Sequence, residues 1–352
     1  MAFTTIAKPS VHFDCPTWDG SASTTTITGM GFKPDALWIK RYEGSSGHPI
    51  FNNSTQGTAV NWSPSQYNGN DSTVYVASYT SDGFTLTGNQ NNTNAASQKY
   101  MAACWKANGG TTASNSDGSI TSTVQANTTS GVAIVKYTGT GSNATVGHGI
   151  GIAPKILWVK HKDVADYGAL GVGGTTLIAD SWTDYKEACN FSSGLIDNVA
   201  FWNDTAPTSS VFSIGTHDHV NKSSTEYIAY AFAEVQGFSK MGFYSGTGNV
   251  QGTKVYCGFR PRYIVLKNAD DSEDWVVKVT GLTGYGLGGQ RTQTIKYNSA
   301  STTTNCTINF ESNGFRLTTT DAKANGEDVK YFYMAFAEMP MVGTNGTIAL
   351  SA

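Results

Sequence analysis

Two histidines that flank an aspartate form the most chemically suggestive short segment of the sequence. The segment THDHVN contains His217, Asp218 and His219. On a strand, residues two apart point to the same side, so both imidazoles would face one ligand. Such a pair could bind a metal ion or act as acid and base, which makes His217 and His219 metal candidates. The alternative is a solvated polar loop.

Two glutamates follow strongly aromatic segments and could form a hydrolytic pair. Glu234 ends YIAYAFAE and Glu338 ends YFYMAFAE. Two carboxylates within roughly 5–10 Å of each other can hydrolyse a glycosidic bond. We interpret these two instead as equivalent residues that end strands of different domains. The sequence also contains no nucleotide-binding loop, zinc-protease motif or hydrolase motif, so we predict no catalytic residue and no cofactor.

Aromatic residues in variable stretches are the best candidates for contact with a ligand or a partner. An exposed aromatic ring can stack on a sugar or become buried in a protein interface. The alternative is packing in the core, which uses most aromatic residues of a β-sandwich. Our candidates are Trp62, Tyr67, Trp182, Tyr185 and Trp202, together with Asp218.

The composition is typical of an all-β protein. Only 14% of the residues are charged, against about 25% in an average globular protein. Threonine and aromatic residues favour strands, whereas the 39 glycines, with asparagine and serine, favour turns. We therefore expect short strands that are joined by tight turns.

The charge and the cysteines exclude several classes of protein. The net charge is −3 and the basic residues are scattered, which argues against nucleic-acid binding. No apolar run approaches the ~20 residues of a membrane span, so we expect no membrane insertion. The five cysteines form no C-x-x-C pair, and the first residues do not resemble a signal peptide. We expect folding in the cytosol with reduced thiols.

A ten-residue segment occurs three times, which indicates tandem repeats. GFKPDALWIK, GIAPKILWVK and GFRPRYIVLK contain Pro34, Pro154 and Pro261. Each is followed by a phenylalanine landmark and then by an aromatic strand. The landmarks are Phe84, Phe212 and Phe315, and the strands are YMAACWKA, YIAYAFAE and YFYMAFAE. YTGTG and YSGTG precede the second and third copies, and PTWDG takes this place in the first.

We predict three tandem antiparallel β-sandwich repeats, lectin-like or jelly-roll-like, at 1–107, 132–236 and 237–352. Residues 108–131 are rich in Ser, Thr, Asn and Gly and predict a linker or an extended strap. Because only a short segment joins copies two and three, we expect copy one to be the more independent. In KILWVK both alternating faces are apolar, which favours a central strand covered on both sides or one that lies in a subunit contact.

The lysines that end the repeated segment predict a structural role. Lys40, Lys160 and Lys267 recur in all three copies. Recurrence within a repeat points first to a requirement of the fold. We expect each ammonium group to reach past the edge of the sheet into water.

Longer phrases of the sequence resemble tandem-repeat virion structural proteins of marine bacteriophages, which are tail-fibre-like or decoration proteins. The phrases include GFKPDALWIKR, GIAPKILWVKH, DGSITSTVQANTTSG and YIAYAFAEVQGFSKMGFYSGTG. The resemblance covers nearly the whole chain. It implies lectin-like sandwich modules in a virion that assembles in the bacterial cytoplasm, and it supplies no catalytic residues.

Three functions are consistent with these observations. The first is a tail-fibre or receptor-contacting adhesin that binds a glycan or protein of the host surface. The second is a capsid decoration protein that stabilises the head lattice, and the third is a polysaccharide depolymerase. For the first two we expect other virion proteins as partners and a homo-oligomer, with a trimer suggested by analogy to virion parts.

Overall fold

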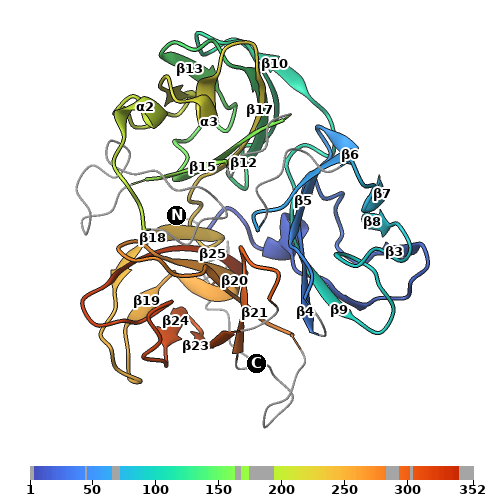
Figure 1. The fold of residues 1–352 in the computed structure, drawn as a ribbon, viewed down its shortest axis with the longest axis vertical. Helices are drawn as coiled ribbons and strands as arrows, with labels where there is room; N and C mark the ends of the chain where they lie inside the picture. The colour runs from blue at the N-terminus through green and yellow to red at the C-terminus, as the bar shows by residue number, and fades with distance from the viewer. Residues whose placement is uncertain are drawn as a thin grey trace.

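The computed structural model describes residues 4–43, 46–65, 72–162, 168–173, 194–282, 293–301 and 304–340. Within these residues nearly every regular element is a strand, and the strands of each sheet pair antiparallel. The all-β fold class predicted from the sequence is confirmed. The strands group into three lobes, which we name module 1 (residues 4–107), module 2 (residues 108–234) and module 3 (residues 235–340) (Figure 1).

Module 1 contains two sheets. The larger has the order β1-β9-β4-β5-β6, with β2 also paired to β9, and the smaller has the order β3-β8-β7. The elements are η1 (Pro9–Val11), β1 (Phe13–Asp14), β2 (Thr17–Asp19), β3 (Thr25–Ile27), β4 (Ala36–Glu43), β5 (Ile50–Asn53), β6 (Gly57–Trp62), β7 (Val76–Thr80), β8 (Gly83–Leu86) and β9 (Lys99–Trp105).

Module 2 also contains a large and a small sheet. Their orders are β10-β11-β12-β17-β14-β15 and β13-β16. The elements are β10 (Ala113–Asn115), β11 (Ser122–Asn127), β12 (Val132–Thr138), β13 (Ala144–Gly147), β14 (Ile156–His161), β15 (Ala169–Val172), α2 (Val199–Trp202), β16 (Val211–Ile214), α3 (Asp218–Asn221) and β17 (Glu226–Phe232).

Module 3 is a single sheet of eight strands that curls around its own core. Its order is β18-β25-β20-β21-β22-β23-β24-β19. The strands are β18 (Ser239–Ser245), β19 (Lys254–Tyr256), β20 (Phe259–Asn268), β21 (Val276–Val279), β22 (Gln293–Lys296), β23 (Thr304–Glu311), β24 (Gly314–Leu317) and β25 (Lys330–Pro340).

The repeated segment and the aromatic strand pair in the same register in each module. Strands β4, β14 and β20 pair with β9, β17 and β25. The residue four places after the anchor proline lies opposite the residue two places before Trp105, Phe232 or Phe336 of the aromatic strand. The pairs are Trp38 with Ala103, Trp158 with Tyr230 and Val265 with Met334. The grouping into three equivalent repeats remains our interpretation of such recurring contacts.

The two faces of each large sheet enter different cores. In β14, Leu157 and Val159 pack into the core of module 2, whereas Ile156 and Trp158 lie on the opposite face. That face packs against the other two modules in one shared cluster, which we name the central core. Its large members include Phe13, Trp38, Phe51, Trp62 and Trp105 of module 1, Trp158, Tyr230 and Phe232 of module 2, and Tyr263, Trp275, Tyr297 and Phe336 of module 3.

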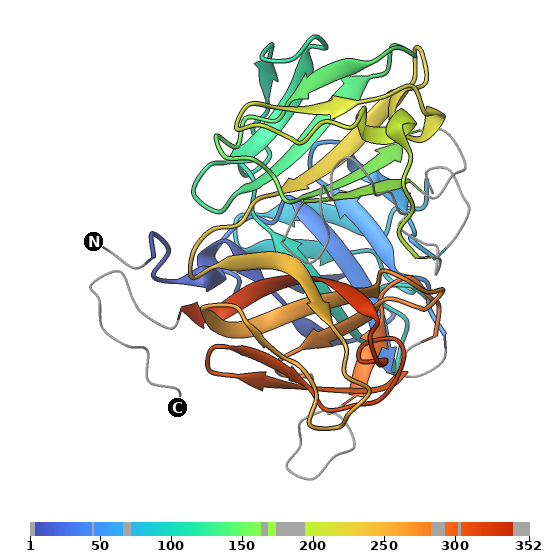
Figure 2. The ribbon, with the colours of Figure 1, turned by 90° about the vertical axis from the view of Figure 1, so that its left-hand side faces the viewer.

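The central core lies where the three lobes meet. Both views show the modules as separate lobes around this region, with module 1 between modules 2 and 3 in the turned view (Figures 1 and 2). Ring contacts cross the boundaries: Trp105 lies 5.5 Å from Phe232 and 5.8 Å from Phe336 between ring centroids. The apolar second face predicted for KILWVK is therefore covered within one chain.

Two expectations about domain organisation are corrected. Residues 108–131 are not only a linker, because β10 and β11 extend the large sheet of module 2, where Val124 is buried and Gln125 is fully buried. Module 1 is not the more independent part, because its residues make up one third of the central core. Polar contacts also join it to the others, such as the 2.8 Å hydrogen bond from Asn53 Nδ2 to Tyr230 Oη.

Candidate functional site

The histidine segment forms a helical turn and not a strand. His217 caps α3, and its Nδ1 accepts a hydrogen bond of 3.1 Å from the backbone N–H of His219. The backbone N–H of Asn221 donates to the carbonyl of His217 at 2.9 Å. This local bonding closes a turn, which is why the expected parallel projection of the two imidazoles from a strand is wrong.

The same turn occurs at equivalent places in the other modules. The backbone N–H of Asn94 donates to the Gln90 carbonyl at 2.7 Å, and that of Asn325 donates to the Asp321 carbonyl at 2.8 Å. Asn94, Asn221 and Asn325 are all fully buried. The segment THDHVN is therefore first a structural turn of module 2.

A tyrosine holds each turn against the aromatic strand. Tyr100, Tyr227 and Tyr331 donate their hydroxyls to the carbonyls of Asn91, Asp218 and Ala322. Their rings stack on Trp18, Tyr137 and Tyr244. A glycine lies two residues after each of these stacking partners. In module 2 this is Gly139, where a Cβ would lie only 2.3 Å from the Lys222 carbonyl oxygen, so the turn packs too closely for a side chain.

The geometry around the histidines does not assemble a metal centre. His217 and His219 have ring centroids 4.7 Å apart, and His161 lies 6.4 Å from His219. His161 Nε2 bonds the carbonyl of Asp218. Across the described residues, no three His, Cys, Asp or Glu side chains are grouped so that they could hold a metal ion. The Asp218 carboxylate is 67% exposed and lies 4.0 Å from Lys222 Nζ.

Two aromatic ligand candidates are core residues. Trp62 is 3% exposed and stacks on Phe51 with centroids 4.4 Å apart, and Trp202 is 2% exposed in the core of module 2. The expectation that they contact a ligand is corrected, because tertiary packing covers their rings. Tyr67, Trp182 and Tyr185 lie outside the described residues.

The two glutamates are each held by a basic side chain of module 3. Glu234 lies 3.0 Å from Lys240 Nζ, and Glu338 lies 2.8 Å from Arg260 Nε. Glu234 also accepts the backbone N–H of Met241. Each glutamate thus fixes the end of its aromatic strand.

The repeated lysines are buried and do not extend past the sheet edge. Lys40, Lys160 and Lys267 are at most 2% exposed. Lys40 Nζ donates to the carbonyls of Gly47 at 2.9 Å and Ser299 at 2.7 Å, so it connects modules 1 and 3. Burial, and next the nearby Arg41 and Lys296, lower the pKa of Lys40 to about 7. The expected solvent exposure is wrong because a neighbouring module covers this end of β4.

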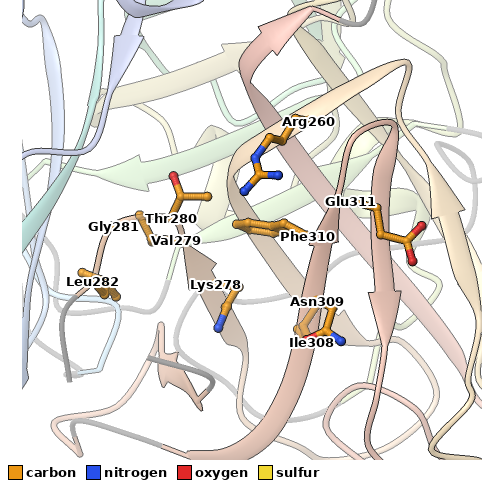
Figure 3. A pocket seen from close by; sticks show the side chains of 10 residues that line it. All are labelled: Arg260, Lys278, Val279, Thr280, Gly281, Leu282, Ile308, Asn309, Phe310 and Glu311. Carbon is orange, nitrogen blue, oxygen red and sulfur yellow. The ribbon is translucent and has the colours of Figure 1, made fainter. Parts of the chain in front are cut away.

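A pocket in module 3 has the size of a small-molecule site. Its volume is about 390 Å³, within the range of roughly 300–1,000 Å³ of small-molecule sites. It lies between the start of β20, the end of β21 and the end of β23 (Figure 3). The lining residues are Arg260, Lys278, Val279, Thr280, Gly281, Leu282, Ile308, Asn309, Phe310 and Glu311.

Figure 3 shows the guanidinium of Arg260 pointing toward the ring of Phe310, while the Glu311 carboxylate points away from it. Glu311 is bound instead by Lys254 at 2.5 Å and Arg316 at 3.0 Å. The hydrogen bond from Lys254, and also that from Arg316, lowers the pKa of Glu311. The pocket therefore offers a cation and an aromatic ring, with its carboxylate already neutralised.

No sequence motif predicted this pocket. Arg260 and Phe310 are 50 residues apart, and neither belongs to a recognisable motif. One hint was available: the positions before the anchor proline are Lys33 in copy one and Ala153 in copy two, so arginine is specific to copy three.

A family model for a domain of unknown function, DUF7483, matches residues 8–340. The chain belongs to the DUF7483 family. The DUF7483 match spans all three modules, so the family unit corresponds to the whole three-lobed body and not to one sandwich. No curated protein matches the chain. Among the described residues of this DUF7483 protein, no helix is long and apolar enough to cross a membrane.

Proposed function

We propose that this protein is a non-enzymatic structural component of a bacteriophage virion that contacts the host surface, as a tail-fibre or receptor-contacting adhesin does. The single observation that carries the proposal is the central core. It joins the three modules into one body, whose strands are connected by loops. Such a body can present a binding surface with little loss of conformational entropy on contact.

Two further observations support an adhesin. Long phrases of the sequence resemble virion structural proteins. The pocket of module 3 combines a guanidinium with an aromatic ring, which suits a polar surface molecule. We propose other tail proteins and a host glycan or receptor as partners, in a homo-oligomer that we take to be a trimer.

Capsid decoration is the second candidate, and one observation favours it. The three lobes surround a common centre (Figure 1). A body of this shape could sit on a local threefold axis of a coat lattice, with one lobe on each neighbouring subunit. In that case the loops would bind coat protein instead of a receptor.

Immunogold labelling of intact particles distinguishes the two proposals. An antibody against the purified chain should label the tail tip, and particles that lack the gene provide the control. Label spread over the head would exclude the adhesin and support decoration.

A further inference from the structure

We propose that the pocket of module 3 binds a sugar ring that carries a carboxylate, as in an acidic surface polysaccharide. This inference rests on the proposed adhesin function and specifies its ligand. It is carried by the arrangement of Arg260, Phe310, Thr280 and Asn309.

Arg260 is positioned to bind an anion. Its Nε donates to Glu338 Oε2 at 2.8 Å, which fixes the side chain, and the side chain remains 31% exposed. Within the described part of the chain, its two terminal nitrogens make no hydrogen bond. A guanidinium held in this way can donate two parallel hydrogen bonds to a carboxylate.

The surroundings of Arg260 are positive. Two carboxylates lie near the pocket, those of Glu311 and Glu338, and three cationic side chains lie against them: Lys254, Arg316 and Arg260. Both carboxylates are bound by these cations. A local excess of positive charge in a chain with a net charge of −3 favours an anionic ligand.

The remaining lining residues suit a sugar ring. Phe310 is half-buried, so part of its ring can stack on the C–H face of a sugar. Asn309 is exposed, and its amide can both donate to and accept from hydroxyl groups. Thr280 accepts a hydrogen bond of 3.0 Å from Arg262 and donates one of 3.3 Å to Glu338, so its hydroxyl is held at the rim.

The pocket should be unique to module 3. Copies one and two have Lys33 and Ala153 in place of Arg260, and Tyr79 and Pro207 in place of Phe310. We therefore expect one binding site per chain.

Isothermal titration of the full chain with trigalacturonate tests the inference, with its methyl ester as the neutral control. At low salt we expect one site per chain and at least tenfold weaker binding of the ester, since esterification removes the charge that Arg260 binds. Absence of binding, or equal binding of the ester, would overturn the inference.

Three variants locate the site. Arg260→Gln should weaken trigalacturonate binding about tenfold or more, and Phe310→Leu, which keeps apolar volume but loses the ring, about fivefold. Lys222→Gln removes one positive charge from a 50% exposed side chain of module 2 and should leave binding unchanged. Thermal melting of each variant separates loss of binding from loss of folding, and unchanged binding by folded Arg260→Gln would refute the site.

The outcome is independent of the test for virion location. Tail labelling without trigalacturonate binding would refute the acidic-sugar inference alone. Binding by a protein that labels the head would refute the adhesin function and leave the pocket as a sugar site.

Discussion

Three buried asparagines show how single residues shape each module. Asn221 accepts a hydrogen bond from the Thr140 N–H at 2.7 Å, and its amide donates to the carbonyls of Ser142 and Gly215, both at 2.6 Å. Asn94 and Asn325 bond the preceding hairpin in the same way. Because these groups are buried, they need protein partners, and removal of the amide leaves several of them unsatisfied.

Asn221→Ala should therefore lower the free energy of unfolding by about 3 kcal/mol, measured by urea denaturation. Asn143→Ala is the matched control, since Asn143 is exposed and bonds only the half-buried Asn203 in the described structure. Its effect should stay within about 0.5 kcal/mol. Equal effects of the two substitutions would contradict the structural role of the turn.

At the scale of elements, β4, β14 and β20 connect the modules through both apolar and charged groups. Each places an apolar residue and then a lysine on the face that meets the other modules. Lys40 Nζ donates to backbone carbonyls, and these hydrogen bonds offset part of the cost of burying its charge. Lys40 Nζ also donates to the carbonyls of Ser299 and Ala300, so these hydrogen bonds of β4 exist only while module 3 is docked on module 1.

Lys40 should make stability depend on pH. Its pKa is about 7 in the folded chain and 10.5 without burial, so below pH 7 both states hold the proton. Between these values only the unfolded chain holds it, and stability rises with pH by up to about 1.4 kcal/mol per unit. The unfolding free energy of the wild type should thus rise relative to that of Lys40→Met from pH 7 to pH 9.

Lys222→Met is the control for this measurement, because the Lys222 side chain is half exposed. Its difference from the wild type should stay constant over the same pH range. A constant difference for Lys40→Met as well would show that the folded protein does not depress the pKa of Lys40.

Local patterns predicted the strands well and the contacts between modules poorly. The alternation in KILWVK correctly indicated two covered faces, since side-chain direction follows directly from strand geometry. It could not indicate what covers the second face. Trp62 and Trp202 were misjudged for the same reason: an aromatic residue in a variable stretch carries no sign of its burial. The pocket joins Arg260 and Phe310 only through tertiary structure.

At the scale of the whole molecule, the central core makes the three modules one body. Trp38, Trp105 and Trp158 come from two modules, are at most 1% exposed, and pack with Tyr263 and Tyr297 of the third. A module removed from the chain would expose this apolar face to water, at a cost of roughly 25 cal/mol for each Å². No module should therefore be stable by itself.

Differential scanning calorimetry of the full chain tests this central claim most directly. We predict one unfolding transition whose calorimetric enthalpy equals its van't Hoff enthalpy, because loss of any module exposes the core of all three. Two or more separate transitions, or a calorimetric enthalpy that is a multiple of the van't Hoff value, would show three independent domains and contradict the account.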